Sequence, residues 1–345
     1  MTPLLFIIGL CIVVLTILDI LYTVLAPNGA GYLAGKITFY IWRISLKIAG
    51  YDHRSKLLCN VGPYMLLLIV QIWVLLIWVG NAIIIYSDPH SLYNSTQQQY
   101  QEDFISNLYF SGYVLSAMGH GDYSPSNGWW KAYTAFISFT GVVFITLAIS
   151  YLLPVIQAVT DKRTLSLRIS SFGNSPEDIL KKNWKNDHFE YLVKELKDLK
   201  PAIFSLAQQH MAYPIIHYFH SKDRNESAPI NIATVDETLT ILRSLLKDNS
   251  TESTLINDLV STQSAITYFL STLKSGHIKP GNDEPEVPGL DYINDFDLPE
   301  RCSVEEIKST FRKHRKRRKL LLAYIQNDAW KWEDVVSDND DISLE

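Results

Sequence analysis

Two glycines separated by one residue and followed by an aspartate, Gly119-His120-Gly121-Asp122, form the stretch with the most distinctive chemical potential. Glycine permits backbone conformations closed to other residues, so successive peptide carbonyls can point toward one axis. Rings of carbonyl oxygens can replace the water around a cation. The preceding Ala117 and Met118 would extend this row of carbonyls. Because a lone Gly-x-Gly is also a common turn, the surrounding elements must decide between the two interpretations.

The segment before these glycines favours the first interpretation. Phe104–Ala117 is largely apolar, but as a helix it would reach only about 21 Å, too short to cross a bilayer. Irregular backbone at membrane depth is tolerated only where protein buries it or where it lines water. A half-length helix followed by a Gly-x-Gly loop therefore predicts a pore. One chain supplies one strand of such a ring, so several copies must surround an axis, and we expect four.

Three longer apolar runs, residues 3–25, 57–86 and 132–159, are each long enough to cross the membrane. The loop 87–131 is acidic, whereas five basic residues lie between or at the edge of the first two runs: Lys36, Arg43, Lys47, Arg54 and Lys56. The positive-inside rule then places the N-terminus outside and the second half of the chain in the cytoplasm. We expect a plasma membrane protein, in a bacterium the inner membrane.

With these elements in place, Leu108–Leu153 resembles the pore module of the potassium channel family, with a pore helix, a filter and an inner helix in that order. The family filter reads Thr-Val-Gly-Tyr-Gly-Asp, and both glycines and the aspartate match. The resemblance implies a homotetramer without a cofactor, and potassium or other monovalent cations as permeant ions. It implies that these ions are coordinated by Ala117, Met118, Gly119, His120 and Gly121.

Two departures from the family pattern matter. Ala117 replaces a threonine whose hydroxyl forms the innermost ion site, and His120 replaces the tyrosine that braces the filter from behind. We expect Asp122, Tyr109 and Tyr113 to support the filter instead. Strict potassium selectivity is therefore less secure than permeation by cations.

Two residues of the third span are candidates for gating. Gly141 stands where many family members place a hinge glycine, but close helix packing explains a small residue equally well. Pro154 should kink the inner end of the span.

The chain thus divides into a first span with an amphipathic segment (1–56), a pore module (57–165) and a helical cytoplasmic domain (166–345). The fold class is an all-α membrane protein with three transmembrane helices, a re-entrant pore helix and an all-α soluble domain. Residues 36–49 form either a helix in the membrane plane or a cytosolic hairpin helix. Cytoplasmic helices are expected over Glu177–Leu199, Ala202–Phe219, Asp236–Lys247, Ser253–Lys274 and Ser303–Asn327, and a surface loop over His277–Pro299.

The strongest charge feature of the second half is a polybasic run: Arg312, Lys313, His314, Arg315, Lys316, Arg317, Arg318 and Lys319. It either binds anionic lipid headgroups or another polyanion, or is neutralised by the chain's own acids, such as the following Asp334, Asp338, Asp340, Asp341 and Glu345. We expect no nucleic-acid partner.

Other polar residues have a less specific interpretation. His210, His217 and His220 could bind a metal, but their apolar neighbours favour packing. Asp19, inside the first span, should reach the interface or pair with Lys36 or Arg43. No constellation of residues indicates an enzyme.

The sequence therefore predicts a passive cation channel regulated by its cytoplasmic domain. A non-conducting membrane receptor or scaffold with a degenerate filter is the alternative, and a transporter subunit is a weaker one because the sequence shows only one pore segment.

Overall fold

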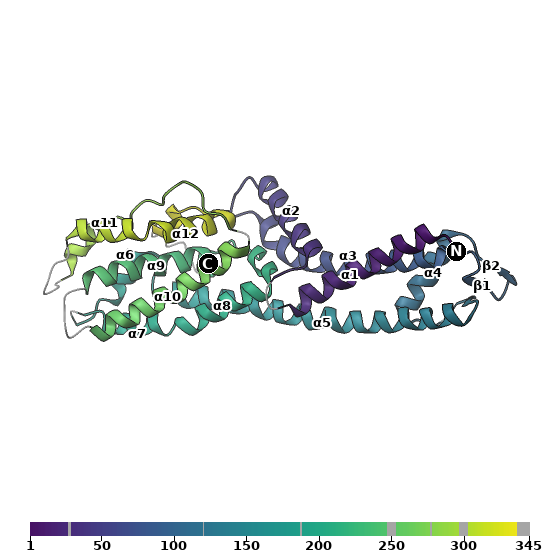
Figure 1. The fold of residues 1–345 in the computed structure, drawn as a ribbon. Coiled ribbons are helices and arrows are strands. Elements are labelled where there is room, and N and C mark those ends of the chain that lie inside the picture. The colour runs from purple at the N-terminus through teal and green to yellow at the C-terminus, as the bar shows by residue number, and fades with distance from the viewer. Residues whose placement is uncertain are drawn as a thin grey trace, which may run out of the picture. The chain divides into compact units, whose positions relative to one another are not determined.

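The protein, seen here as a computed structural model, is described over residues 1–26, 29–119, 121–186, 188–246, 253–276, 278–296 and 303–336 (Figure 1). It divides into two compact units. The first consists of Met1–Phe39 and Pro63–Val155, and the second of Tyr40–Gly62 and Ile156–Glu345. The described residues are predominantly helical, which confirms the predicted fold class.

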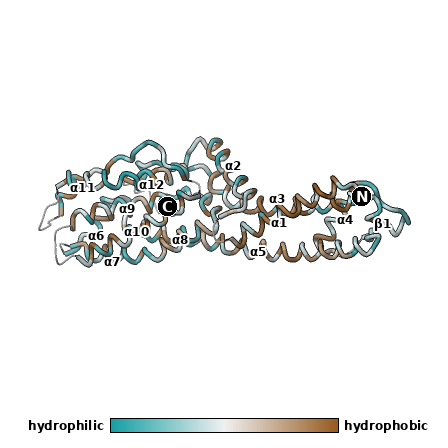
Figure 2. The backbone as a smooth tube through the Cα atoms, viewed as in Figure 1, coloured by the Kyte–Doolittle hydropathy of each residue, from teal (hydrophilic) through white to brown (hydrophobic). Residues whose placement is uncertain are grey.

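Three helices are long and apolar enough to cross a membrane: α1 (Pro3–Leu25), α3 (Lys56–Tyr86) and α5 (Gly128–Ser170). Figure 2 shows long hydrophobic stretches along each of them. Even the 23 residues of α1 reach about 35 Å, more than the roughly 30 Å of a hydrocarbon core. The three predicted spans are confirmed, and α5 extends beyond 132–159 at both ends.

Glycines allow α1 and α3 to pack closely in the first unit. A Cβ atom on Gly9 would lie 2.7 Å from the Gly80 carbonyl oxygen, and one on Gly80 would lie 2.8 Å from Val13 Cγ2. Small residues at such crossings let helix backbones approach one another in a membrane. This contact fixes the first span against the outer helix of the pore module.

The Asp19 carboxylate joins three helices of the first unit. Its oxygens accept hydrogen bonds from the Leu33 and Ala34 backbone N–H groups, at 2.8 and 3.3 Å, at the start of α2 (Tyr32–Ile48). They also accept one from Trp73 Nε1 of α3 at 2.9 Å. Asp19 is buried, so the predicted extension to the membrane interface is wrong, because these N–H groups satisfy the carboxylate inside the protein.

A small sheet, which the sequence did not reveal, lies in the acidic loop. Strand β1 (Leu92–Asn94) pairs antiparallel with β2 (Gln99–Tyr100) and with β3 (Tyr123–Pro125), in the order β2-β1-β3. Tyr93 lies opposite both Tyr100 and Ser124. Since β3 directly follows the glycine-rich loop, the sheet holds that loop's exit.

The second unit is built from helices packed around one buried helix, α9 (Ala228–Leu245). Its other described elements are α6 (Pro176–Asn183), α7 (Glu190–Lys197), α8 (Lys200–Ala212), α10 (Ser253–Gly276), α11 (Val304–Lys313), α12 (Arg315–Asn327), α13 (Glu333–Val336) and the 3₁₀ turns η1 (Pro214–Tyr218), η2 (Arg224–Glu226) and η4 (Asp291–Asp295). All residues of α9 except Arg243 are buried, so this helix is the centre of the unit's core.

Three predicted helices are broken in the structure. Glu177–Leu199 divides into α6 and α7, because Trp184 leaves the helical conformation and packs on Phe189 and Phe296, with ring centroids 4.6 and 5.2 Å away. Ala202–Phe219 ends as a helix at Ala212, since the following Pro214 lacks an N–H donor.

The third break falls inside the polybasic run. His314 is the C-cap of α11 and the N-cap of α12, so the predicted helix Ser303–Asn327 forms two helices. The predicted capping box of Ser303 and Glu306 is present at the start of α11.

Two other predictions need adjustment. The helix predicted from Asp236 already begins at Ala228, and its predicted end, Lys247, lies outside the described residues. The segment His277–Pro299, predicted as a surface loop, contributes Leu290, Ile293 and Phe296 to the core instead. Residue 277 and residues 297–299 of this segment are not among those described.

Candidate functional site

The predicted half-length helix is α4 (Phe104–Leu115), whose 12 residues reach about 18 Å. Asp103 caps its start, since the side chain accepts a hydrogen bond from Ser106 N at 2.8 Å. At its end, Ala117 N donates to Val114 O and Met118 N donates to Tyr113 O, at 3.0 and 3.1 Å. This pattern is a Schellman motif, which ends the helix sharply and starts the loop.

Helix α3 holds α4 through one tryptophan. Trp78 Nε1 donates to the Leu108 carbonyl at 2.8 Å, and the Trp78 carbonyl accepts from Ser111 Oγ at 3.1 Å. A Cβ on Gly112 would lie 2.8 Å from the same Trp78 Nε1 atom. Two hydrogen bonds and a close contact thus fix the depth and rotation of α4.

Helix α5 packs on the end of α4 at Gly141. A Cβ added there would overlap the Leu115 carbonyl oxygen, so only glycine fits. Of the two interpretations of Gly141, the structure supports close packing. Pro154 lies inside α5, which continues past it to Ser170.

The loop after α4 has an unusual backbone. Ala117 has a φ of +57° and Gly119 a φ of +71°. An L-residue other than glycine in this left-handed region costs roughly 1–2 kcal/mol. Strain of this kind gathers at functional sites, where the surrounding structure maintains it. Here the Schellman hydrogen bonds impose it on Ala117.

The loop's exit is braced by Tyr113 of α4. Its hydroxyl donates to the Tyr123 carbonyl at 2.9 Å, and a Cβ on Gly121 would lie 2.8 Å from its ring. The Asp122 carbonyl accepts from both Ser95 N and Ser95 Oγ at 3.0 Å. The loop is therefore fixed on both sides of its second glycine.

The other predicted site residues take clear positions. The Tyr109 ring lies 5.5 Å from Tyr113 and 6.0 Å from Tyr123, so both predicted tyrosines lie beside the loop exit. Met118 and Asp122 are exposed. His120 lies outside the described residues. The structure therefore brings the loop, Tyr109 and Tyr113 together.

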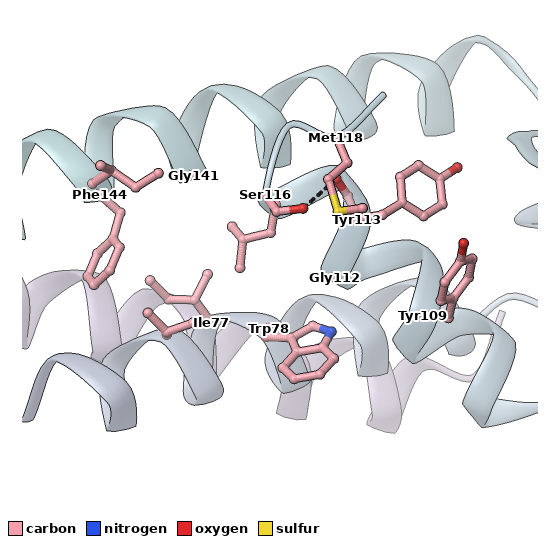
Figure 3. A pocket seen from close by; sticks show the side chains of 12 residues that line it. Ile77, Trp78, Tyr109, Gly112, Tyr113, Ser116, Met118, Gly141 and Phe144 are labelled. Carbon is pink, nitrogen blue, oxygen red and sulfur yellow. Dashed lines mark hydrogen bonds between the residues drawn. The ribbon is translucent and has the colours of Figure 1, made fainter. Parts of the chain in front are cut away.

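An apolar cavity of about 440 Å³ lies beside the loop, between α3, α4 and α5. Figure 3 shows Trp78, Tyr113, Met118 and Phe144 around it, and the hydrogen bond from Ser116 Oγ to the Tyr113 carbonyl at 3.0 Å. Its lining is almost entirely apolar.

The polybasic run is largely engaged within the second unit. Arg318 is buried and forms a bidentate pair with Glu237 at 2.8 and 3.0 Å, and its guanidinium lies over the Phe311 and Trp332 rings. Arg317 pairs with Asp236 at 3.0 Å.

The outer members of the run also have acidic neighbours. Arg315 and Lys319 pair with Glu284, and Arg312 lies 3.8 Å from Glu305. The structure thus supports neutralisation by the chain's own acids, and the acids that pair with the run among the described residues lie earlier in the sequence. Of the predicted C-terminal acids, Asp338, Asp340, Asp341 and Glu345 lie outside the described residues. Binding of anionic headgroups stays a prediction for the exposed Arg312, Lys313, Arg315 and Lys316.

The three histidines of the second unit are packed in its interior, as predicted. His210, His217 and His220 are all buried. His210 Nδ1 donates to the Leu206 carbonyl at 3.0 Å, and burial lowers the pKa of His210 to about 3. Among the described residues, no group of three metal-ligating side chains is found.

Sequence reasoning missed the partners of several site residues. Tyr113 was expected near the filter, but its bond to the Tyr123 carbonyl depends on the small sheet. Asp19 was flagged as an ionisable residue within a span, whereas its tryptophan partner lies 54 positions away. Trp73 in turn packs edge-on against Tyr151 of α5, with ring centroids 6.3 Å apart. The signal available in the sequence was Asp19 itself, an isolated charged residue in an apolar run, which indicates a buried hydrogen-bond partner but does not identify it.

Comparison with known proteins agrees with this geometry. The family model described as "Ion channel" matches residues 72–158, which include the C-terminal half of α3, all of α4, the loop and the apolar part of α5. The chain is therefore a membrane protein that carries an ion channel domain. It is 32% identical over 325 residues to "Uncharacterized membrane protein YdjJ" of Bacillus subtilis, with 94% of each chain covered, and it belongs to the same family. No solved structure matches the chain significantly.

Proposed function

We propose that this protein is a homotetrameric, potassium-like cation channel of the plasma membrane. Four copies of the loop Ala117–Gly121 surround one axis, and their carbonyl oxygens replace the hydration shell of the permeant ion. The N-terminus lies outside, and the helical cytoplasmic domain regulates opening. Monovalent cations are its permeant ions, and no cofactor is needed.

The observation that carries this proposal is the α4–loop unit. Helix α4 is too short to span a bilayer, yet α3 and α5 clamp it between two spanning helices through Trp78 and Gly141. Backbone groups of a loop at such a place need either protein partners or ions and water. The partial negative charge at the C-terminus of α4 favours a cation at the start of the loop.

The loop conformation adds support. The left-handed φ angles of Ala117 and Gly119, at alternate positions, rotate successive peptide planes away from a regular strand or helix. Bracing by Tyr113 on the loop's exit takes over part of the role of the missing filter tyrosine. A backbone braced in this way is suited to hold its oxygens in place around an ion.

Glycine substitutions provide a matched test. A Cβ would find open space at both Gly119 and Gly128, but only Gly119 has a left-handed φ. Gly119→Ala should strain each loop by about 1–2 kcal/mol and lower potassium flux into liposomes about tenfold or more. Gly128→Ala should leave flux unchanged. Equal flux in both variants, at equal protein incorporation, would contradict the assignment of this loop as the ion path.

A further inference from the structure

The segment that follows α8, residues 214–220, is contacted by residues of α2, α3 and α5 that belong to the second unit. A Cβ on Gly62 of α3 would lie 2.8 Å from the Tyr218 carbonyl oxygen. Lys162 of α5 is buried and its Nζ donates to the Phe219 carbonyl at 2.8 Å. Trp42 of α2 packs on Tyr218, with ring centroids 5.7 Å apart. We call this segment the junction.

His220, at the end of the junction, is buried and uses both ring nitrogens. Nε2 lies 2.7 Å from the His53 carbonyl oxygen, in the linker 49–55 between α2 and α3, and Nδ1 lies 3.1 Å from Asp328 Oδ1. A backbone carbonyl and an ionised carboxylate can each accept a hydrogen bond but cannot donate one. Both ring nitrogens must therefore donate, which requires the doubly protonated, positively charged imidazole.

The charges around His220 favour that form. Burial opposes it, but the Asp328 charge, the hydrogen bond to Asp328 and the His53 carbonyl outweigh burial and raise the pKa of His220. Lys162 of α5 and the His53 ring face it as further titratable groups. Burial lowers the pKa of His53, whose ring stacks on Trp330 at 4.0 Å.

We propose that His220 is a proton-operated latch that holds the linker 49–55, and with it the start of α3, against the helical domain. When the ring loses a proton, it can donate to only one of its two acceptors. The other acceptor is then buried without a donor, which is unfavourable. The linker is released, because its His53 carbonyl is one of these two acceptors.

The direction of the pH dependence follows from the raised pKa. The latch is fully formed below about pH 6.5, the ordinary value for histidine, and is lost as pH rises through the higher value in the folded protein. Since the linker leads directly into α3, alkaline pH in the cytoplasm releases the start of α3 from the helical domain. This consequence rests on the proposed channel function, but the latch itself does not.

Hydrogen exchange of the full chain in nanodiscs tests the latch without requiring ion flux. After correction for intrinsic exchange, amides of residues 49–55 should exchange about tenfold faster at pH 9 than at pH 6, whereas amides of α9 should not change. His220→Gln should abolish this pH dependence and leave the linker loose at pH 6. His210→Gln, which replaces a buried histidine bonded only within its own helix in the described structure, should retain it.

A second variant keeps the test decisive if His220→Gln destabilises the domain, which faster α9 exchange would reveal. Asp328→Asn removes the opposing charge, so the midpoint of linker release should shift to lower pH. Linker exchange that is flat from pH 6 to pH 9 in the wild-type protein, or a midpoint that Asp328→Asn leaves unchanged, would overturn the proposal. Neither result would bear on whether the loop conducts ions.

Discussion

Gly141→Ala measures how closely α5 packs on the end of α4. Alanine exceeds glycine by about 1 kcal/mol in helix propensity, so the change would stabilise α5 if space were available. The added Cβ would instead overlap the Leu115 carbonyl, a backbone atom that cannot rotate away. Overpacking of this kind costs up to about 3 kcal/mol. We therefore expect a net loss of about 2 kcal/mol in the free energy of unfolding.

Thermal unfolding of the full chain in nanodiscs, followed by tryptophan fluorescence, is the assay. A loss of that size should lower the Tm by about 3 °C, because the entropy of unfolding grows with chain length. Gly35→Ala in α2 is the matched control, because the nearest atom to its added Cβ, Ala30 Cβ, is 3.7 Å away. Its Tm should stay level or rise. If Gly141→Ala raises the Tm as Gly35→Ala does, the close packing is wrong and the hinge interpretation is preferred.

Three further substitutions follow from other contacts. Arg318→Met should destabilise the protein by about 3–5 kcal/mol in thermal unfolding, because it leaves the buried Glu237 carboxylate without its partner. Lys316→Met on the exposed face should change stability by less than about 0.5 kcal/mol. Similar losses in the two variants would refute the buried pair. Tyr113→Phe removes the hydroxyl bond to the loop exit and should lower the Tm and shift the reversal potential, while Tyr109→Phe should do neither. Burial lowers the pKa of His210 to about 3, so the unfolded chain takes up a proton on this histidine at a higher pH than the folded protein does. The contribution of the neutral, buried His210 to the free energy of unfolding is therefore fully present above about pH 6.5 and is lost as pH falls. The loss should reach about 2 kcal/mol by pH 5, and His210→Leu should flatten this acid limb in pH-dependent unfolding.

The spanning helices were predictable because each is a single long apolar run, whose burial in lipid does not depend on distant residues. The α4–loop unit was predictable for a related reason: an apolar run too short to span, followed by two glycines, has few other structures available in a membrane. Local signals were also sufficient for the capping box at Ser303.

What the sequence could not supply depends on contacts between remote segments. The break between α6 and α7 arises because Trp184 packs on Phe296, more than a hundred residues away. The sequence left both interpretations of the polybasic run open, because the acids that pair with Arg317 and Arg318 lie about eighty residues earlier, on α9. The short strands β1 and β3 carry little signal of their own and pair across the whole pore segment.

Single-channel recording of the purified protein is the most direct test of cation conduction through the loop. With potassium on one side of a planar bilayer and sodium on the other, we expect unitary cation currents whose reversal potential favours potassium. Mass measurement of the same sample should give a tetramer. Absence of current from protein that is demonstrably inserted would refute conduction and favour a non-conducting receptor or scaffold.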